Sequence, residues 1–234
     1  MPSRGAGPAD DARAVRDDTA PDGPEAGRSA RKRQAISEAA TALFLRDGYR
    51  GTSMDEIAAA AAVSKQTVYK QFADKEQLFR HIVLGVTGNS AAIIAGMTAA
   101  LSGAAVTSRE ELRAALTALA RRYLDGVLQP GVLALRRLII AEAERFPDLA
   151  RAYFERAPAR AIEVIESALR DYRDRGLIAA PDPGLAAAHY AYLTLAIPLD
   201  RAQFYPGERP SPAERDRLAA EAVRIFLAAY AVND

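Results

Sequence analysis

Residues 52–78, which read TSMDEIAAAAAVSKQTVYKQFADKEQL, constrain the fold more than any other part of the chain. Ser53, followed three residues later by Glu56, forms a capping box, and Ser64 is a favourable N-cap for the segment after it. Roughly three or four residues around Ala62 separate the two predicted helices, and a connection of that length sets two helices across each other. The stretch therefore predicts a helix-turn-helix.

The second predicted helix has two different faces. Val68 and Phe72 are four positions apart, so they lie on one face and are expected to be buried. The other positions carry cations and amides, namely Lys65, Gln66, Lys70 and Gln71. Lysine suits phosphate oxygens, and amides suit the edges of bases. The pattern indicates a helix that faces outward towards nucleic acid.

The distribution of charge agrees with this interpretation, although the net charge of the chain is only +1. Residues 28–80 carry ten Lys and Arg against six acids, which gives the predicted helix-turn-helix a positive surface. Residues 1–27 form an acidic segment rich in Gly and Pro that we expect to be disordered. The basic residues that follow are either an arm that touches the DNA backbone or minor groove, or a solvated helix start: Arg28, Arg31, Lys32 and Arg33.

The rest of the chain also predicts helices, and strand patterns are essentially absent, so the expected fold class is all-α. Asp74 and Gln77 open a helix, and a capping box at Ser108 and Glu111 opens another. Further helices are expected over 132–146, 149–155, 159–175 after a first-turn Pro158, 183–197 with a stop or kink at Pro198, and 213–230 after an N-cap at Ser211. We predict a helix-turn-helix domain over 28–80 and a larger helical domain over 81–234.

Several classes of function are disfavoured by composition. The chain has no Cys and only two His, His81 and His189, so disulfides and thiolate metal sites are excluded and no metal centre or cofactor is expected. No apolar stretch is expected to reach the roughly 18 residues that span a bilayer, and no signal peptide is recognisable, which predicts a cytoplasmic protein without membrane contact. No catalytic motif stands in a convincing context, so an enzyme is not expected.

Ordered motifs in the N-terminal region resemble the DNA-binding domain of the TetR family of one-component transcriptional regulators. The matching residues are Gly48-Tyr49-Arg50-Gly51-Thr52-Ser53, Ile57-Ala58, Val63-Ser64, Thr67-Val68-Tyr69, Phe72 and Asp74-Lys75-Glu76. The resemblance implies a three-helix domain whose recognition helix, at about 64–71, meets base edges through Lys65, Gln66, Tyr69 and Gln71. It implies that Thr52, Thr67, Lys70 and Lys75 hold the DNA backbone.

Two residues depart from the family pattern. Ala62 stands where the family usually has glycine, which costs roughly 1 kcal/mol if that residue is left-handed. Gln66 stands where many members have a small residue, so it is expected to add a base contact of its own. Tyr69 has an alternative role, since its ring is also able to pack on Phe72.

The C-terminal region resembles AcrR- and AefR-like members of the same family through residues 136–158, RRLIIAEAERFPDLARAYFERAP. The resemblance implies a ligand-responsive regulator, most often a repressor, that binds a palindromic double-stranded DNA operator as a homodimer. It implies dimerisation through 213–230 with 159–175 or 185–197, and release by a small lipophilic effector. The expected pocket residues, each of which is alternatively a core or interface residue, are Tyr123, Phe146, Tyr153, Phe154, His189, Tyr190 and Tyr192. The competing hypotheses are a helical adaptor for protein partners and a helical-bundle enzyme without DNA binding.

Overall fold

The computed structural model describes residues 24–101, 106–230 and 232, and within these residues the fold is built from helices without a β-strand. The all-α prediction is confirmed. The helices are α1 (Pro24–Gly51), α2 (Met54–Ala60), α3 (Lys65–Gln71), α4 (Lys75–Leu101), α5 (Arg109–Val127), α6 (Pro130–Ala141), α7 (Pro147–Phe154), α8 (Arg160–Asp174), α9 (Pro183–Phe204) and α10 (Pro212–Tyr230).

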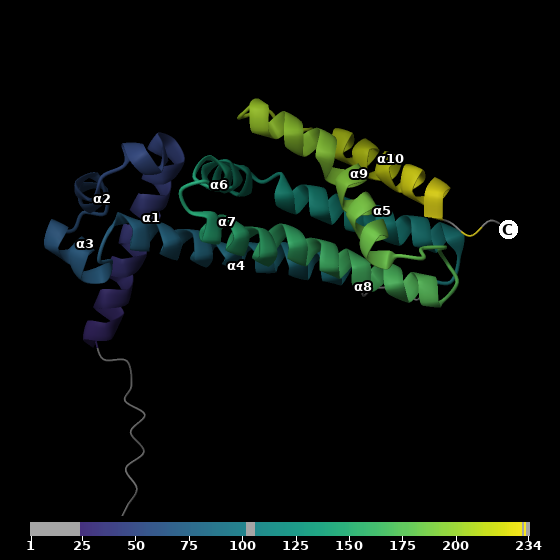
Figure 1. The fold of residues 1–234 in the computed structure, drawn as a ribbon, viewed down its shortest axis with the longest axis horizontal. Coiled ribbons are helices and arrows are strands. Elements are labelled where there is room, and N and C mark those ends of the chain that lie inside the picture. The colour runs from purple at the N-terminus through teal and green to yellow at the C-terminus, as the bar shows by residue number, and fades with distance from the viewer. Residues whose placement is uncertain (1–23, 102–105, 231, 233–234) are drawn as a thin grey trace, which may run out of the picture.

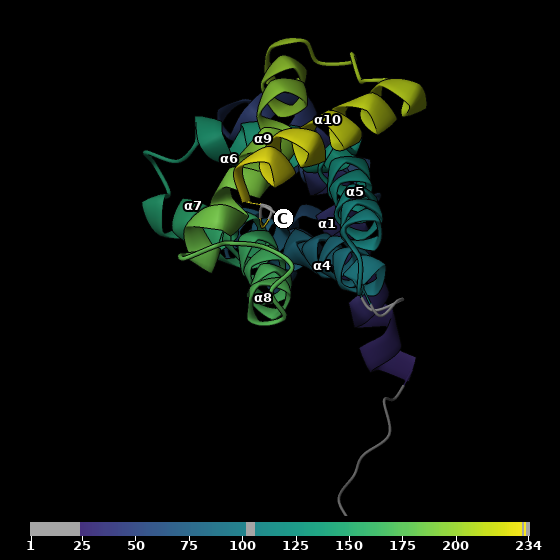
Figure 2. The same ribbon diagram turned by 90° about the vertical axis from the view of Figure 1, so that its right-hand side faces the viewer.

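The molecule is elongated, with α1, α2 and α3 at one end (Figure 1). Helix α4 starts beside α3 and runs from this end into a long helical body, where it packs against α5, α7 and α8. Seen along the body, α4, α5, α8, α9 and α10 surround a shared interior (Figure 2). One long helix therefore connects the helix-turn-helix to the C-terminal bundle.

Helix α1 begins earlier than the sequence predicted. It starts at Pro24, whereas the disordered segment was expected to extend to residue 27, and residues 1–23 lie outside the described part of the chain. Proline is favourable in a first helical turn because its missing N–H has no intrahelical acceptor there. The helix is interrupted at Gly48, which has a φ of 73°. A glycine adopts that conformation without a Cβ clash, as expected for the end of a helix.

Two clusters of buried apolar side chains organise the protein. The N-terminal cluster contains residues of α1–α4, such as Ile36 and Phe79, together with Leu135, Phe146 and Leu149 from α6, α7 and the loop between them. Helix α4 runs without a break through the predicted domain boundary at residue 80. The helix-turn-helix is thus attached to the C-terminal domain by a continuous helix and by a shared apolar core.

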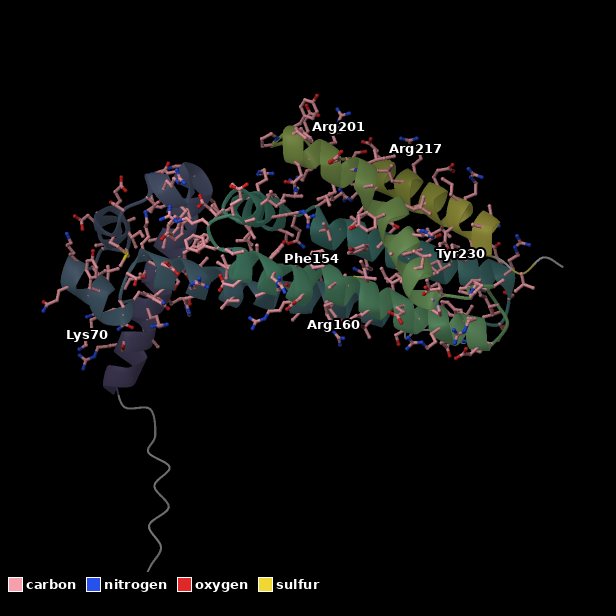
Figure 3. The ribbon with its side chains drawn as sticks, viewed as in Figure 1. Lys70, Phe154, Arg160, Arg201, Arg217 and Tyr230 are labelled. Carbon is pink, nitrogen blue, oxygen red and sulfur yellow. The ribbon has the colours of Figure 1, made fainter. Side chains whose placement is uncertain are left out.

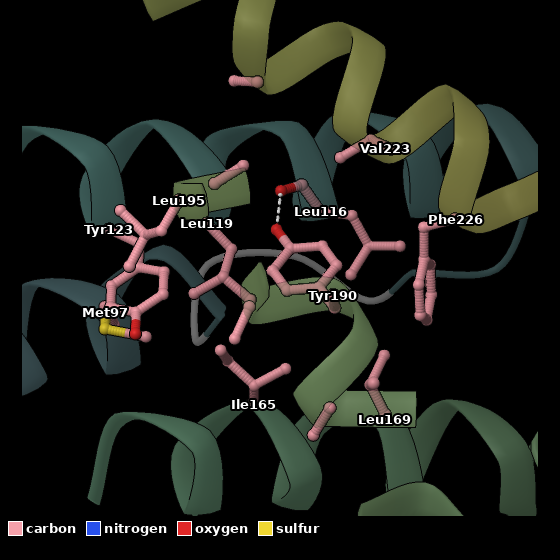
Figure 4. Packing of buried hydrophobic residues seen from close by; sticks show 14 of the residues in the cluster. Met97, Leu116, Leu119, Tyr123, Ile165, Leu169, Tyr190, Leu195, Val223 and Phe226 are labelled. Carbon is pink, nitrogen blue, oxygen red and sulfur yellow. Dashed lines mark hydrogen bonds between the residues drawn. The ribbon is translucent and has the colours of Figure 1, made fainter. Parts of the chain in front are cut away.

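The C-terminal cluster is centred on Tyr190 of α9, which is fully buried (Figure 4). Its hydroxyl donates a hydrogen bond to the carbonyl of Leu116 at 2.5 Å, and its ring lies edge-on to Phe226 at 5.3 Å between centroids. Leucine and isoleucine side chains from α5 and α8 fill the space around the ring. This tyrosine therefore joins α5, α9 and α10.

The predicted helix starts at Ser108 and Ser211 are confirmed by hydrogen bonds from backbone amides to the serine Oγ atoms. Helix α6 ends at Ala141, five residues before the predicted end, and Pro147 then begins α7. The expectation that Pro198 stops or kinks α9 underestimated the helix, which continues to Phe204. Packing of α9 into the C-terminal cluster on both sides of Pro198 offsets the lost backbone hydrogen bond.

The sequence predicted that Pro158 begins a helix, and the structure contradicts this prediction. Pro158 lies inside a π-helical turn, Glu155–Ala159, that joins α7 directly to α8. Proline cannot donate the N–H of an ordinary helical turn, and a wider π turn admits the extra residue. The two helices therefore form one bent rod.

Helix α4 is long and apolar enough to cross a membrane by length and composition, with a mean hydropathy of 1.5 over its most apolar window. The sequence expectation that no stretch would qualify was wrong in this respect. In the fold, α4 begins in the helix-turn-helix, where Leu78, Phe79 and Val83 are buried, and then packs along α5 and α8. Its apolar residues serve as the connection between the two clusters.

Candidate nucleic-acid interface and ligand cavity

The helix-turn-helix, called the reading head below, is formed by α2, a tight turn and α3. Ser53 accepts a hydrogen bond from the backbone amide of Glu56, whose carboxylate accepts one from the amide of Ser53, so the predicted capping box is present. Ser64 accepts from the amide of Thr67 at 3.1 Å and caps α3. These local bonds determine where each helix starts and therefore how sharply the chain turns between them.

The turn contains one strained residue. Ala62 has a φ of 52°, in the left-handed region, and among the described residues it is alone in having a positive φ without being glycine. The Cβ of an alanine crowds the following carbonyl there. The departure from the family pattern noted in the sequence therefore carries a real conformational cost.

We expect Ala62→Gly to raise the free energy of unfolding by about 0.5–1 kcal/mol, because relief of strain outweighs the added freedom of the unfolded chain. The side chain of Ala62 is exposed, so little packing is lost. Ala60→Gly in helical α2 is the matched control and should lower stability by about 1 kcal/mol. Urea unfolding at a fixed protein concentration measures both, and equal destabilisation by the two glycines would contradict the strain argument.

Helix α3 buries one face and exposes the other. Val68 is fully buried and Phe72 is 4% exposed, so the inner face is anchored in the N-terminal cluster. The outer face carries the exposed side chains of Lys65, Gln66, Tyr69 and Lys70, and Lys70 projects from the far end of the molecule (Figure 3). Tyr69 is 45% exposed, which disfavours the alternative in which its ring packs fully on its neighbours. The arrangement leaves cations, an amide and a phenol available to a ligand.

Gln71 and Thr67 are less available than the sequence suggested. The amide of Gln71 donates to the hydroxyl of Ser29 at 2.9 Å, and its backbone carbonyl accepts from Arg33 at 2.8 Å. The guanidinium of Arg33 also lies 4.2 Å from the centre of the Phe72 ring. The hydroxyl of Thr67 is 2.8 Å from the capping hydroxyl of α3. The basic start of α1 therefore holds the C-terminal end of the recognition helix.

Thr52 and Lys75 have structural roles in this conformation. Thr52 is 2% exposed and its hydroxyl donates to the carbonyl of Gly48, so its side chain does not reach the surface, contrary to the role expected from the resemblance. The ammonium of Lys75 donates to the carbonyls of Tyr49 and Thr52 at 2.9 and 2.7 Å. Burial and, secondarily, the charge of Arg145 lower the pKa of Lys75. Together the two residues satisfy the carbonyls where α1 ends, which leaves Lys75 one N–H for another acceptor.

Lys65 forms a surface ion pair with Asp55 of α2, with 2.8 Å between the ammonium and a carboxylate oxygen. The hydrogen bond to Asp55 raises the pKa of Lys65, so the side chain is charged at neutral pH. Both side chains are more than half exposed, and such pairs contribute little to stability. The pair is easily exchanged for a phosphate or a base.

A cavity of about 560 Å³ lies in the C-terminal domain between α4, α5, α6, α7, α8 and α9. This volume falls within the range of sites that bind small organic molecules. The polar part of the lining consists of Ser90, Tyr123, Arg136, Tyr153, Tyr192, Asp200 and Gln203. Most of the remaining lining is aliphatic: Ile93, Ile94, Val127, Val132, Leu135, Ile140, Ile162, Leu195, Ile197 and Leu199. The cavity therefore suits a lipophilic molecule with a small polar part.

Tyr123, Tyr153, Phe154 and Tyr192, all proposed from the sequence, line this cavity. They come from α5, α7 and α9, and Phe154 stands at the end of α7 midway along the body (Figure 3). Burial raises the pKa of Tyr123 to about 12 and also raises that of Tyr153, so both phenols keep their protons at neutral pH. Each of these two phenols therefore offers a hydroxyl donor to the cavity.

Phe146, in contrast, does not line the cavity. It belongs to the N-terminal cluster, where its ring centre lies 5.0 Å from that of Tyr49 and 5.4 Å from that of Phe79. It precedes Pro147 at the start of α7, and the loop before it brings the ring back onto α1 and α4. The expectation that it contacts a ligand is corrected on this geometry.

His189 and Tyr190 also lie outside the cavity. Successive residues of a helix point about 100° apart, so Tyr190, two positions before Tyr192 on α9, faces nearly the opposite way. The Nδ1 atom of His189 is 2.6 Å from the hydroxyl of Tyr230 on α10, and Tyr190 is buried in the C-terminal cluster. Both residues form contacts between helices, which is the alternative role that the sequence analysis gave for each of them.

Arg136 and Gln203 line the cavity but were not proposed from the sequence. Arg136 is followed directly by Arg137, which instead donates to the carbonyl of Ala202 at 3.3 Å. The spacing of the apolar residues in α6 shows which face of the helix is buried. It does not show which of the two adjacent arginines faces the cavity, because that depends on where the neighbouring helix lies. The sequence likewise does not show that Gln203, near the end of α9, faces the cavity.

The chain matches two family descriptions. Residues 36–82 match the N-terminal domain of bacterial regulatory proteins of the tetR family, and residues 114–232 match the C-terminal domain of AefR-like transcriptional repressors. A segment of 51 residues is 45% identical to the HTH-type transcriptional regulator YhgD of Bacillus subtilis. That match spans 22% of this chain and 27% of the Bacillus protein.

Solved structures extend the similarity to almost the whole molecule. A protein from Mesorhizobium loti assigned to the TetR family is 42% identical, with a TM-score of 0.76 over 88% of this chain and 99% of the other. The flavonoid-responsive regulator FrrA is 28% identical, with a TM-score of 0.66 over 88% of this chain and 100% of the other. A TetR-family regulator from Pseudomonas syringae pv. tomato is also 28% identical, with a TM-score of 0.64 over 87% and 98%. With both domains matched in order and a relative this similar along its length, the chain belongs to the TetR family of bacterial transcriptional regulators.

Proposed function

We propose that the protein is a repressor that binds an inverted-repeat operator as a homodimer and is released from it by a small lipophilic effector. In this proposal the N-terminal domain reads DNA, and the C-terminal domain binds the effector and the second subunit. The observation that carries the proposal is the two-sided character of α3. Its inner face is anchored by Val68 and Phe72, while its outer face presents exposed Lys, Gln and Tyr side chains.

Each exposed side chain of α3 has a chemical partner on B-form DNA. Gln66 is able to form paired hydrogen bonds with adenine, and Lys65 to donate to guanine. Tyr69 offers its ring to a thymine methyl group, and Lys70 offers its charge to a phosphate. We expect Thr52 and Lys75 to contribute indirectly, by keeping the end of α1 in place beside the turn.

A homodimer is supported by unpaired apolar residues on α9 and α10. The apolar residues of α10 are divided in the fold, because Ala222 and Phe226 are buried in the subunit core while Ile225 and Ala229 are exposed. Helix α9 also has exposed apolar side chains that do not line the cavity: Leu185, Leu193 and Phe204. A twofold pair of recognition helices about 34–36 Å apart would read two halves of a palindrome in successive major grooves.

Repression and effector release are supported by the relatives. The matched C-terminal family is described as that of AefR-like repressors, and the regulator FrrA, 28% identical, responds to flavonoids. A flavonoid is an aromatic, largely apolar molecule, which is the chemistry that the cavity favours. We therefore expect a small organic effector, and we expect the protein to act in the cytoplasm, where the operator is.

Helix α7 is suited to couple the cavity to the reading head. Its C-terminal end lines the cavity, while at its N-terminal end Phe146 packs on Tyr49 and Phe79. Asp148 pairs with Arg80 of α4 through a bidentate contact. An effector that prefers a displaced α7 would move the reading head and weaken DNA binding by its coupling energy, typically about 1–3 kcal/mol.

DNA binding by the purified full chain tests the proposal. We expect a fragment from upstream of its own gene to bind at least about 100-fold tighter than random duplex at moderate salt, since specific sites exceed non-specific ones by factors of this order or more. Affinity should fall steeply as salt increases, because phosphate contacts release counterions. Equal affinity for both duplexes, measured by fluorescence anisotropy, would refute operator recognition.

A further inference from the structure

The polar groups of the ligand cavity are unevenly distributed between donors and acceptors. Arg136 of α6 acts on the phenols of Tyr153 and Tyr123, since its positive charge opposes the rise in pKa that burial causes in both. Both phenols are protonated at neutral pH, so they and the guanidinium all offer hydrogens. One side of the cavity is therefore a cluster of donors around a positive charge.

Helix α9 contributes another donor. The side-chain amide nitrogen of Gln203 on α9 is buried, and within the described residues no acceptor pairs with it. A buried N–H without a partner is unfavourable, which is why such groups are rare in folded proteins. Because Gln203 lines the cavity, an acceptor on a bound molecule would satisfy it.

The two donors are close to each other in the fold. Arg137, the next residue after Arg136, donates to the carbonyl of Ala202, the residue before Gln203, at 3.3 Å. This bond brings α6 and α9 together at the level where Arg136 and Gln203 both line the cavity. One small polar group of a ligand is thus within the reach of both side chains.

Asp200 is the one carboxylate among the lining residues that the structure describes, and it does not cancel this arrangement. It is exposed, so water screens its charge. Arg136 is half-buried between two phenols that are largely shielded from water, where a charge acts more strongly. The electrostatic preference of the inner cavity is therefore for negative charge.

We infer that the effector is an amphipathic organic anion, with an aromatic or alicyclic body in the aliphatic part of the cavity and a carboxylate, phenolate or sulfonate that accepts hydrogen bonds from Arg136 and Gln203. This inference rests on the proposed function and specifies the effector of the same site. A charge-assisted hydrogen bond is stronger than a neutral one, so the anionic group decides between ligands of equal lipophilicity.

A matched pair of fluorescent probes tests the inference on the purified full chain. Anilinonaphthalene sulfonate carries an anionic group, and N-phenylnaphthylamine has the same ring framework without it. We expect Arg136→Gln to weaken sulfonate binding by about 10-fold or more and to change binding of the neutral probe by less than about 3-fold. Arg136→Lys should restore part of the sulfonate affinity, because the charge is kept without the planar donor pair.

The controls separate a specific site from general surface binding. Arg151→Gln removes the same charge from an exposed position of α7 outside the cavity and should leave both probes unaffected. Gln203→Leu should weaken binding of the sulfonate probe and leave the affinity for the neutral probe unchanged or higher. The inference is overturned if neither probe binds, or if Arg136→Gln affects both probes equally.

Operator binding in the presence of each probe distinguishes the inference from the proposed function. Arg136-dependent binding of the sulfonate that lowers operator affinity supports both. Arg136-dependent binding without any effect on operator affinity supports the anion site and contradicts its role in release. Release by the neutral probe alone contradicts the anion site and supports ligand-responsive repression.

Discussion

We expect the double substitution Gln66→Ala and Tyr69→Ala to abolish operator discrimination while leaving the fold intact. A base contact by glutamine contributes about 1–3 kcal/mol, and a dimer loses the contact in both half-sites. Specific affinity should therefore fall by about 4 kcal/mol, close to 1000-fold, towards the non-specific level. Both side chains are exposed on α3, so the midpoint of thermal unfolding should change little.

Two controls make this result interpretable. Lys70→Ala removes a cation that the proposal assigns to a phosphate, so it should weaken binding to the operator and to random duplex alike. The slope of log affinity against log salt concentration should decrease by about one for each subunit. Gln129→Ala removes an exposed glutamine far from α3 and should have no effect on DNA binding. Unchanged discrimination in the double variant would remove α3 as the reading element.

The largest loss of stability is expected for Tyr190→Ala. The side chain is fully buried, bonded to the carbonyl of Leu116 and packed against Phe226, so its removal leaves a large cavity between three helices. Truncation of a large buried aromatic residue costs about 3–5 kcal/mol. We expect a decrease of that size in the free energy of unfolding, measured by urea denaturation at a fixed protein concentration.

Comparison with two other variants identifies the cause of that loss. Tyr190→Phe keeps the ring and loses only the hydrogen bond, so it should cost about 1 kcal/mol. Tyr69→Ala removes the same side chain from a position that is 45% exposed and should change stability by less than about 0.5 kcal/mol while it weakens operator binding. A similar loss of stability from Tyr69→Ala and Tyr190→Ala would contradict the assignment of the two tyrosines to surface and core.

Much of the reading head was predictable from the sequence, because its structure is determined by short-range bonds. The hydrogen bonds at Ser53, Ser64 and Asp74 join residues three positions apart, so their donors and acceptors are visible in the sequence itself. The left-handed conformation of Ala62 follows from the same turn. The bonds from Lys75 to the carbonyls of Tyr49 and Thr52 were not predictable in the same way, because these partners lie 26 and 23 residues earlier in the chain.

The ligand cavity was only partly predictable, and α9 illustrates the reason. His189, Tyr190 and Tyr192 look alike as polar aromatic residues in an apolar segment. In the fold they face α10, the core and the cavity respectively. The neighbour that each of these side chains faces depends on the rotation of α9 about its own axis. That rotation is set by the packing of α9 against α5, α8 and α10.

The sequence by itself determined the helical class, the serine-capped starts of α2, α3, α5 and α10 and the exposed chemistry of α3, because capping bonds and apolar periodicity act over a few residues. The tertiary structure alone decided which arginine of α6 enters the cavity, how α7 continues through a π turn into α8, and how Phe146 joins the two domains. Those features depend on contacts between segments far apart in the chain, whose geometry is fixed only when the helices pack together.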